Sequence, residues 1–191
     1  LEDCYTEELA DNWSANDQMR EIVTQLAEAA SDKKLKTRLQ KAVTGIEKHT
    51  KTIQALLKEL GEDSPEHCKG MEGLVKEAKK HALDAKIKDE AVRDVVIVAQ
   101  YQRMCHYGIC GIGTAKAFAE ALGRKDHAKK LDTVLAEIYG ADENMTDLAE
   151  RYGEAAAVLA YRACAEAIPQ LQALAEDLGD VDFARIRSLY Y

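Results

Sequence analysis

Apolar residues recur at helical spacing along four long stretches of the chain. In the second stretch, alternating steps of four and three residues from Leu35 reach Leu39, Ala42, Ile46, His49, Ile53, Leu56 and Leu60. All of these residues are apolar except His49. Such steps place side chains on one face of an α-helix. The pattern therefore predicts an amphipathic helix with one polar residue in the middle of its inward face.

The other three stretches repeat this pattern, each with polar or sulfur-containing residues near the middle of the inward face. These central residues are Asn16 in the first stretch, Gln102 and Cys105 in the third, and Asp142 in the fourth. Four long amphipathic helices are typical of a helical bundle, whose sites are built from side chains on facing helices. We therefore expect a functional site halfway along the bundle.

Capping residues mark the ends of these helices. The first helix is expected at about residues 7–30, and the second follows it and ends near residue 60. The third is expected at 89–122 and the fourth at 126–152. Asp32 and Asp89 are suited to N-caps, and Gly61 and Gly123 to the positions after a helix. Ser64 followed by Pro65 predicts another N-cap, for a short helical segment in the long connection.

The connections have unequal lengths. About 28 residues separate the second helix from the third, whereas the other two links are a few residues long. A helix of about 26 residues is near 40 Å long, so only the long link can bring the chain back along the bundle. The sequence predicts an all-α, ferritin-like four-helix bundle over residues 1–152, with a crossover between helices two and three. Residues 153–191 are expected to form a C-terminal helical extension packed on the bundle.

Composition narrows the possible functions. The 191 residues are 47% hydrophobic and 31% charged, which is typical of a globular protein, and the net charge is −8. A negative chain without a long basic cluster is not expected to bind nucleic acid. The most apolar run, residues 95–99, is too short to span a bilayer, so we expect no membrane partner.

The cysteines indicate a reducing compartment. Their number is odd and no C-x-x-C pair occurs; they are Cys4, Cys68, Cys105, Cys110 and Cys164. Reduced thiols in a cytoplasmic protein explain this pattern better than a disulfide framework. Cys105 and Cys110 are expected to be small buried residues in the third helix.

Several separated motifs resemble the YciF-like family of ferritin-like proteins over about residues 1–150. They are Leu1-Glu2-Asp3, Glu7-Glu8-Leu9, Met71 to Glu77, Ala91 to Asp94, Gln102-Arg103, His106-Tyr107 and Gly113-Thr114. The resemblance implies a bacterial, stress-associated bundle that forms a homodimer. In typical members it also implies a di-iron centre in the bundle core.

The expected iron ligands are largely replaced in this chain. A di-iron centre needs about six ligands, chiefly carboxylates. Where typical members carry acidic residues, this chain has Asn16, Thr44, Gly45, Cys105, Gly108 and Ile138, and it keeps Glu137 and Asp142. The Glu-x-x-His spacing of ferritin-like metal helices is absent from the sequence. We therefore expect no di-iron cofactor, with a single iron or other divalent metal as the alternative.

His49 has two interpretations. A lone histidine on an apolar face is usually hydrogen-bonded to a neighbour, and Asp142 is the expected partner. Alternatively, His49 and Asp142 bind one metal ion together with Cys105 or Glu137. The glycines at positions 45 and 108 also leave two alternatives, because the helices either pack closely over the vacated site or leave a cavity there.

The expected site is a pocket or residual metal-site layer formed by Asn16, Gly45, Ile46, His49, Cys105, Gly108, Glu137, Ile138 and Asp142. Its mixture of apolar residues and a few polar groups is typical of a small-molecule pocket. No catalytic residues are expected. The favoured function is a non-catalytic, stress-associated binding or structural protein, possessing a degenerate di-iron site that holds a small ligand. The alternative is a metalloenzyme of the di-iron oxidase or peroxide-handling type with an altered metal site.

Overall fold

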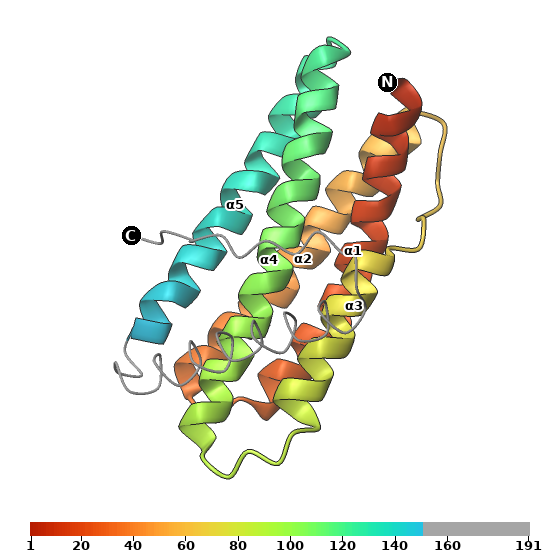
Figure 1. Ribbon diagram of the computed structural model, residues 1–191. Coiled ribbons are helices and arrows are strands. Elements are labelled where there is room, and N and C mark those ends of the chain that lie inside the picture. The colour runs from red at the N-terminus through yellow and green to blue at the C-terminus, as the bar shows by residue number, and fades with distance from the viewer. Residues whose placement is uncertain (151–191) are drawn as a thin grey trace, which may run out of the picture.

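The computed structural model describes residues 1–150, which form an all-helical bundle (Figure 1). The helices are α1 (Glu2–Ala29), α2 (Lys33–Glu59), α3 (Lys69–Ala78), the π-helical turn η1 (Lys79–Leu83), α4 (Glu90–Ala121) and α5 (Lys125–Ala149). Helices α1 and α2 form one antiparallel hairpin and α4 and α5 form the other, with the crossover between them (Figure 1). The predicted four-helix topology is confirmed. The expected domain boundary at residue 152 and the C-terminal extension lie outside the described residues.

Four predicted helix ends coincide with capping groups. The carboxylate of Asp32 accepts two backbone N–H groups at the start of α2, and that of Asp89 does so at the start of α4. Gly61 and Gly123 follow α2 and α4 with φ of 89° and 72°. Only glycine adopts these left-handed conformations without a steric cost. Asp32 and Gly123 lie in the short links of the two hairpins, whereas Gly61 and Asp89 lie at the two ends of the long crossover.

Helix α1 begins at Glu2, five residues before the predicted start. Glu2 and Asp3 lie in its first turn, where negative charge interacts favourably with the helix dipole. The expected start at residue 7 was too late, because Tyr5, one turn before Leu9, is also buried and extends the inward face of the helix.

The predicted cap at Ser64 is wrong, because α3 begins at Lys69 with Cys68 as its N-cap. Contacts with α1 fix this start. The Cys68 N–H donates to Ser14 Oγ at 3.0 Å, and the Cys68 carbonyl accepts from Gln18 Nε2 at 3.0 Å. The Cys68 sulfur in turn accepts the N–H of Met71 at 3.3 Å. A long-range contact, rather than a local cap signal, therefore places α3 across α1 and α4.

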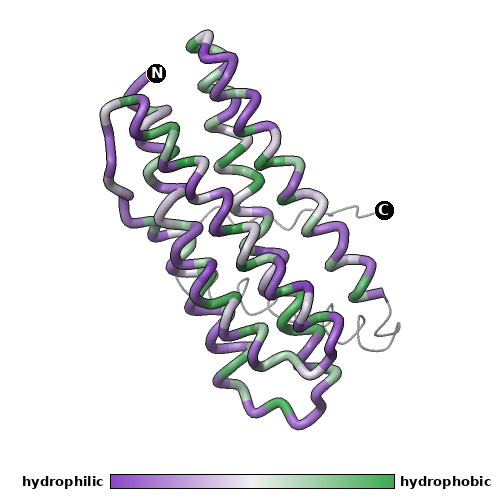
Figure 2. Tube along the Cα trace, turned by 180° about the vertical axis from the view of Figure 1, so that it is seen from behind, coloured by the Kyte–Doolittle hydropathy of each residue, from purple (hydrophilic) through white to green (hydrophobic). Residues whose placement is uncertain are grey.

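Apolar and polar positions alternate along each helix (Figure 2), as expected for amphipathic helices around a shared core. The buried apolar residues form two clusters, one containing Leu26, Leu35 and Met104 and the other Leu9, Ile53 and Leu131. Ile138 packs against both. Among the described helices, none combines the length and apolarity needed to cross a lipid bilayer.

The four sides of the bundle are not equally closed. Helices α1 and α2, α4 and α5, and α1 and α4 pack along much of their lengths, whereas α2 and α5 have far fewer close approaches. On the α1–α4 side, Gly111 lies directly against the buried Asn12 side chain, leaving no room for a Cβ. The open side of the bundle is therefore the one between α2 and α5.

Candidate functional site

A cavity of about 580 Å³ lies where α2 and α5 separate, with α1 and α4 behind it. It is called the waist cavity below. Its lining residues are Asn16, Met19, Arg38, Lys41, Ala42, Gly45, Ile46, His49, Tyr101, Met104, Cys105, Gly108, Glu137, Ile138, Gly140, Ala141, Asn144 and Met145. Every residue of the predicted site lines this cavity except Asp142. The volume is within the range of ordinary small-molecule sites.

The helices leave space at both unexpected glycines. A Cβ added at Gly45 would meet no atom within 4 Å, and one at Gly108 would meet only Ile138 Cδ1, at 3.8 Å. A Cβ would therefore have open space at Gly45 and an ordinary van der Waals contact at Gly108. Of the two alternatives from the sequence, the geometry therefore agrees with a cavity at these positions rather than with close helix packing.

His49 lies at one end of the waist cavity. Its Nε2 is 2.9 Å from Glu137 Oε2, and Lys48 binds the other oxygen of the same carboxylate. Burial lowers the pKa of His49, although the Glu137 hydrogen bond opposes this effect. Hydrogen bonds from Lys48 and then His49 lower the pKa of Glu137. At neutral pH, a neutral imidazole therefore donates from Nε2 to an ionised carboxylate.

The expected pairing of His49 with Asp142 is wrong. Asp142 Oδ2 instead lies 3.3 Å from Nε2 of the exposed His106. Its other oxygen, Oδ1, is buried without a hydrogen-bond partner in the described part of the chain. Asp142 and Glu137 lie five residues apart on α5, so their side chains leave the helix in different directions. Only Glu137 faces α2 at the level of His49.

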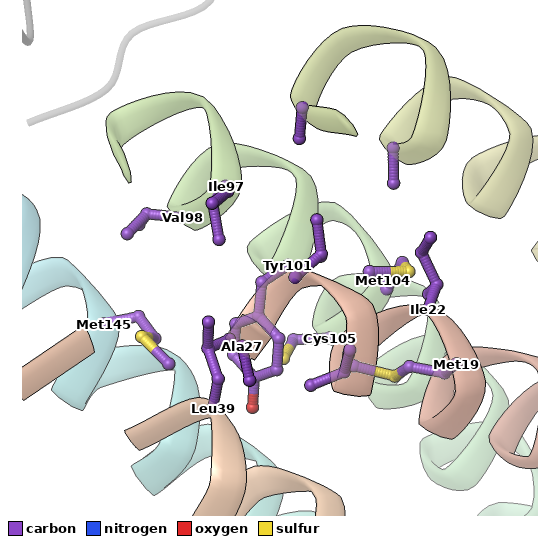
Figure 3. Packing of buried hydrophobic residues seen from close by; sticks show 14 of the residues in the cluster. Met19, Ile22, Ala27, Leu39, Ile97, Val98, Tyr101, Met104, Cys105 and Met145 are labelled. Atoms are coloured by element: carbon purple, nitrogen blue, oxygen red, sulfur yellow. The ribbon is translucent and has the colours of Figure 1, made fainter. Parts of the chain in front are cut away.

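Cys105 and Tyr101 form part of the cavity wall behind α2 and α5. Figure 3 shows both side chains among Met19, Met104 and Met145. Burial raises the pKa of the Cys105 thiol to about 12; the hydrogen bond with Tyr101 opposes this increase, and the Asp142 charge adds a smaller one. The thiol is therefore protonated at neutral pH, a form that is a poor nucleophile and metal ligand. The expectation that Cys110 is also buried is wrong, because Cys110 is exposed.

The donor set does not fit a di-iron centre. In residues 1–150, no group of three or more His, Cys, Asp or Glu side chains lies close enough to hold a metal ion. The cavity wall offers one carboxylate, Glu137, which is already bound to His49 and Lys48. Two ferrous ions here would leave several positive charges without counter-charges in a partly buried site.

Sequence reasoning missed several lining residues, of which Arg38 is the most informative. Arg38 lies on α2 in line with Ala42, Gly45 and His49, at the edge of the predicted inward face. A long cation at such an edge usually extends to water, so the sequence alone gave no reason to select it. In the structure its Nη1 atom is buried and has no hydrogen-bond partner among the described residues.

Comparisons with known proteins identify the family. The model of the family described as "Domain of unknown function (DUF892)" matches residues 1–158. Protein YciF of Escherichia coli strain K12 is 32% identical over 157 residues, covering 78% of this chain and 90% of YciF.

Solved structures agree with this relationship. The crystal structure of the E. coli stress protein YciF has a TM-score of 0.75 and 29% identity, covering 79% of this chain and 95% of that one. YcfI from Rhodopseudomonas palustris, named as a candidate structural protein, has a TM-score of 0.72 and 32% identity, covering 76% of this chain and 92% of YcfI. Together with the family match, these similarities confirm the resemblance seen in the sequence. The chain therefore belongs to the DUF892 family and is a homologue of E. coli YciF.

Proposed function

We propose that this protein is a non-catalytic, stress-associated member of the YciF-like family that binds a small molecule in the waist cavity. One observation carries the proposal. Gly45 and Gly108 line a cavity of about 580 Å³ at positions where the resemblance implies metal-binding carboxylates. The stress association is supported by the name of the E. coli relative. The resemblance also supports a cytoplasmic homodimer, which we include in the proposal.

The character of the cavity supports binding rather than catalysis. Its wall is mostly apolar, with polar groups gathered at a few positions. The titratable groups on the wall are poorly suited to nucleophilic or acid–base catalysis. The Cys105 thiol is protonated, and His49 and Glu137 are hydrogen-bonded to each other. A wall of this kind holds an apolar body and orients it through a few polar contacts.

Octanol provides a simple probe of this proposal. We expect isothermal titration calorimetry to detect octanol binding to the wild-type chain. Gly108→Leu should lower the affinity at least about tenfold, because its side chain occupies the space beside Ile138. It should not lower the melting temperature, since leucine also has the higher helix propensity.

Gly113→Leu is the matched control for this measurement. Gly113 also lies inside α4 with no atom within 4 Å of an added Cβ, but it does not line the waist cavity. The control variant should bind octanol like the wild type. Equal octanol affinity in Gly108→Leu and the wild type, or no binding to either, would contradict the proposed function.

A metalloenzyme with an altered metal site is the second candidate, favoured by two side chains of metal-binding type, His49 and Glu137, that lie 2.9 Å apart at the cavity edge. After anaerobic loading with ferrous iron and gel filtration, we expect less than one iron ion per chain by elemental analysis. Two iron ions per chain would contradict the replaced-ligand interpretation. One ion that is lost in both His49→Ala and Glu137→Gln would instead favour the metalloenzyme.

A further inference from the structure

One nitrogen of the half-buried Arg38 guanidinium has no acceptor in the part of the chain that the structure describes. The Arg38 side chain lines the waist cavity, and the unpaired nitrogen is its buried Nη1 atom. A guanidinium remains protonated in proteins, so it cannot escape this cost by losing its charge. Buried donors are almost always paired, and an unpaired one usually marks a missing water, ion or ligand. An acceptor from outside the described chain is therefore expected at Arg38.

Charges are unevenly distributed along the cavity. Arg38 and Lys41 lie toward one end of its α2 wall, whereas His49 lies at the other. Glu137, the one carboxylate on the described wall, is beside His49 and bound to Lys48. Asp142 is not on the wall and contacts His106 instead. The Arg38 end of the cavity is therefore positive and suits a carboxylate.

The cavity is long as well as charged at one end. Arg38 and His49 are eleven residues apart on α2, which corresponds to about 16 Å along the helix. Between these ends the wall contains the flexible side chains of Met19, Met104 and Met145. Methionine adapts its shape to an apolar ligand more readily than branched residues do. A methionine-lined space of this length suits a flexible alkyl chain better than a rigid ring system.

From this arrangement we propose that the waist cavity binds a medium-chain alkyl carboxylate. The carboxylate accepts hydrogen bonds from the Arg38 guanidinium, and the alkyl chain extends along the methionines toward His49. Arginine and carboxylate form strong paired hydrogen bonds of matching geometry, so the ligand would satisfy the unpaired donor. This inference rests on the proposed function and adds the chemical class of the ligand.

Octanoate and octanol separate the two proposals, because they share an alkyl chain and differ in the head group. In calorimetry with the full chain, we expect octanoate to bind the wild type at least about tenfold more tightly than octanol does. Arg38→Gln should weaken octanoate binding by about tenfold or more, and should weaken octanol binding by a smaller factor, because a neutral hydroxyl forms a weaker hydrogen bond with the guanidinium than a carboxylate does. It should also be at least as stable as the wild type to urea, since it removes a guanidinium nitrogen that is buried without a hydrogen-bond partner among residues 1–150.

Two controls keep the result specific. Lys51→Gln removes the same charge from an exposed position on α2 outside the waist cavity, so it should leave octanoate affinity unchanged. Octylamine should bind more weakly than octanoate. Equal affinities for octanoate and octanol with no effect of Arg38→Gln would overturn the carboxylate inference while the proposed function stands. A preference for octylamine, or no octanoate binding at all, would overturn it too, with octanol binding still deciding the proposed function.

Discussion

Replacing Asp94 with alanine is expected to lower the free energy of unfolding by about 3 kcal/mol, because three hydrogen bonds to one buried carboxylate are lost. Asp94 is 1% exposed near the start of α4. Its oxygens accept the Ser31 N–H at 2.9 Å, the Ser31 hydroxyl at 2.6 Å and the Asp32 N–H at 2.8 Å. The residue therefore fastens the α1–α2 turn to the second hairpin, and alanine would leave these donors unpaired.

Urea unfolding followed by circular dichroism measures this effect. Asp94→Asn keeps the shape and one acceptor oxygen, so its loss should be smaller than that of alanine. Ser31→Ala removes only the hydroxyl contact and should cost about 1 kcal/mol. A loss below about 0.5 kcal/mol for Asp94→Ala, the level of an ordinary surface change, would show that this contact does not hold the hairpins together.

Alanine substitutions at two glycines should change stability in opposite directions. Gly45→Ala is expected to raise the free energy of unfolding by roughly 0.5–1 kcal/mol, because the helix gains propensity and the Cβ meets nothing within 4 Å. Gly111→Ala is expected to lower it by roughly 1–3 kcal/mol, since the new Cβ collides with the Asn12 amide. That amide cannot move freely, because it is buried and bound to Glu8.

The pair is informative because both glycines lie inside bundle helices and undergo the same chemical change. Urea unfolding of the two variants beside the wild type gives the comparison directly. A loss at Gly45 similar to that at Gly111 would mean that the helices have closed over the waist.

The helices and their connections were predictable because they depend on local signals. The caps at Asp32 and Asp89 and the spacing of apolar residues are properties of short segments, and the long connection allows only one way back along the bundle. The wrong start of α3 has a different origin. Cys68 becomes a cap because Ser14 and Gln18 of α1 hold its backbone, a contact that no local pattern contains.

The sequence predicted which residues lie at the site, but not which side chains contact each other there. Periodicity shows that His49 faces inward, yet its choice of Glu137 over Asp142 depends on how α2 and α5 are rotated and shifted against each other. The same register decides that Arg38 lines the cavity instead of reaching solvent. Such relations between helices arise from packing of the whole core, so a single sequence does not reveal them.

The methyl groups of the four methionines test the central claim, an open cavity that accepts an apolar ligand. Met19, Met104 and Met145 line the waist cavity, whereas Met71 is buried in the same apolar cluster without lining the cavity and serves as an internal control. In a titration of isotope-labelled protein with octanol, followed by nuclear magnetic resonance, the signals of these three residues should shift together and saturate at one equivalent. The Met71 signal should not move. Shifts confined to Met71, equal shifts of all four signals, or no saturable shift would contradict the waist cavity as the binding site.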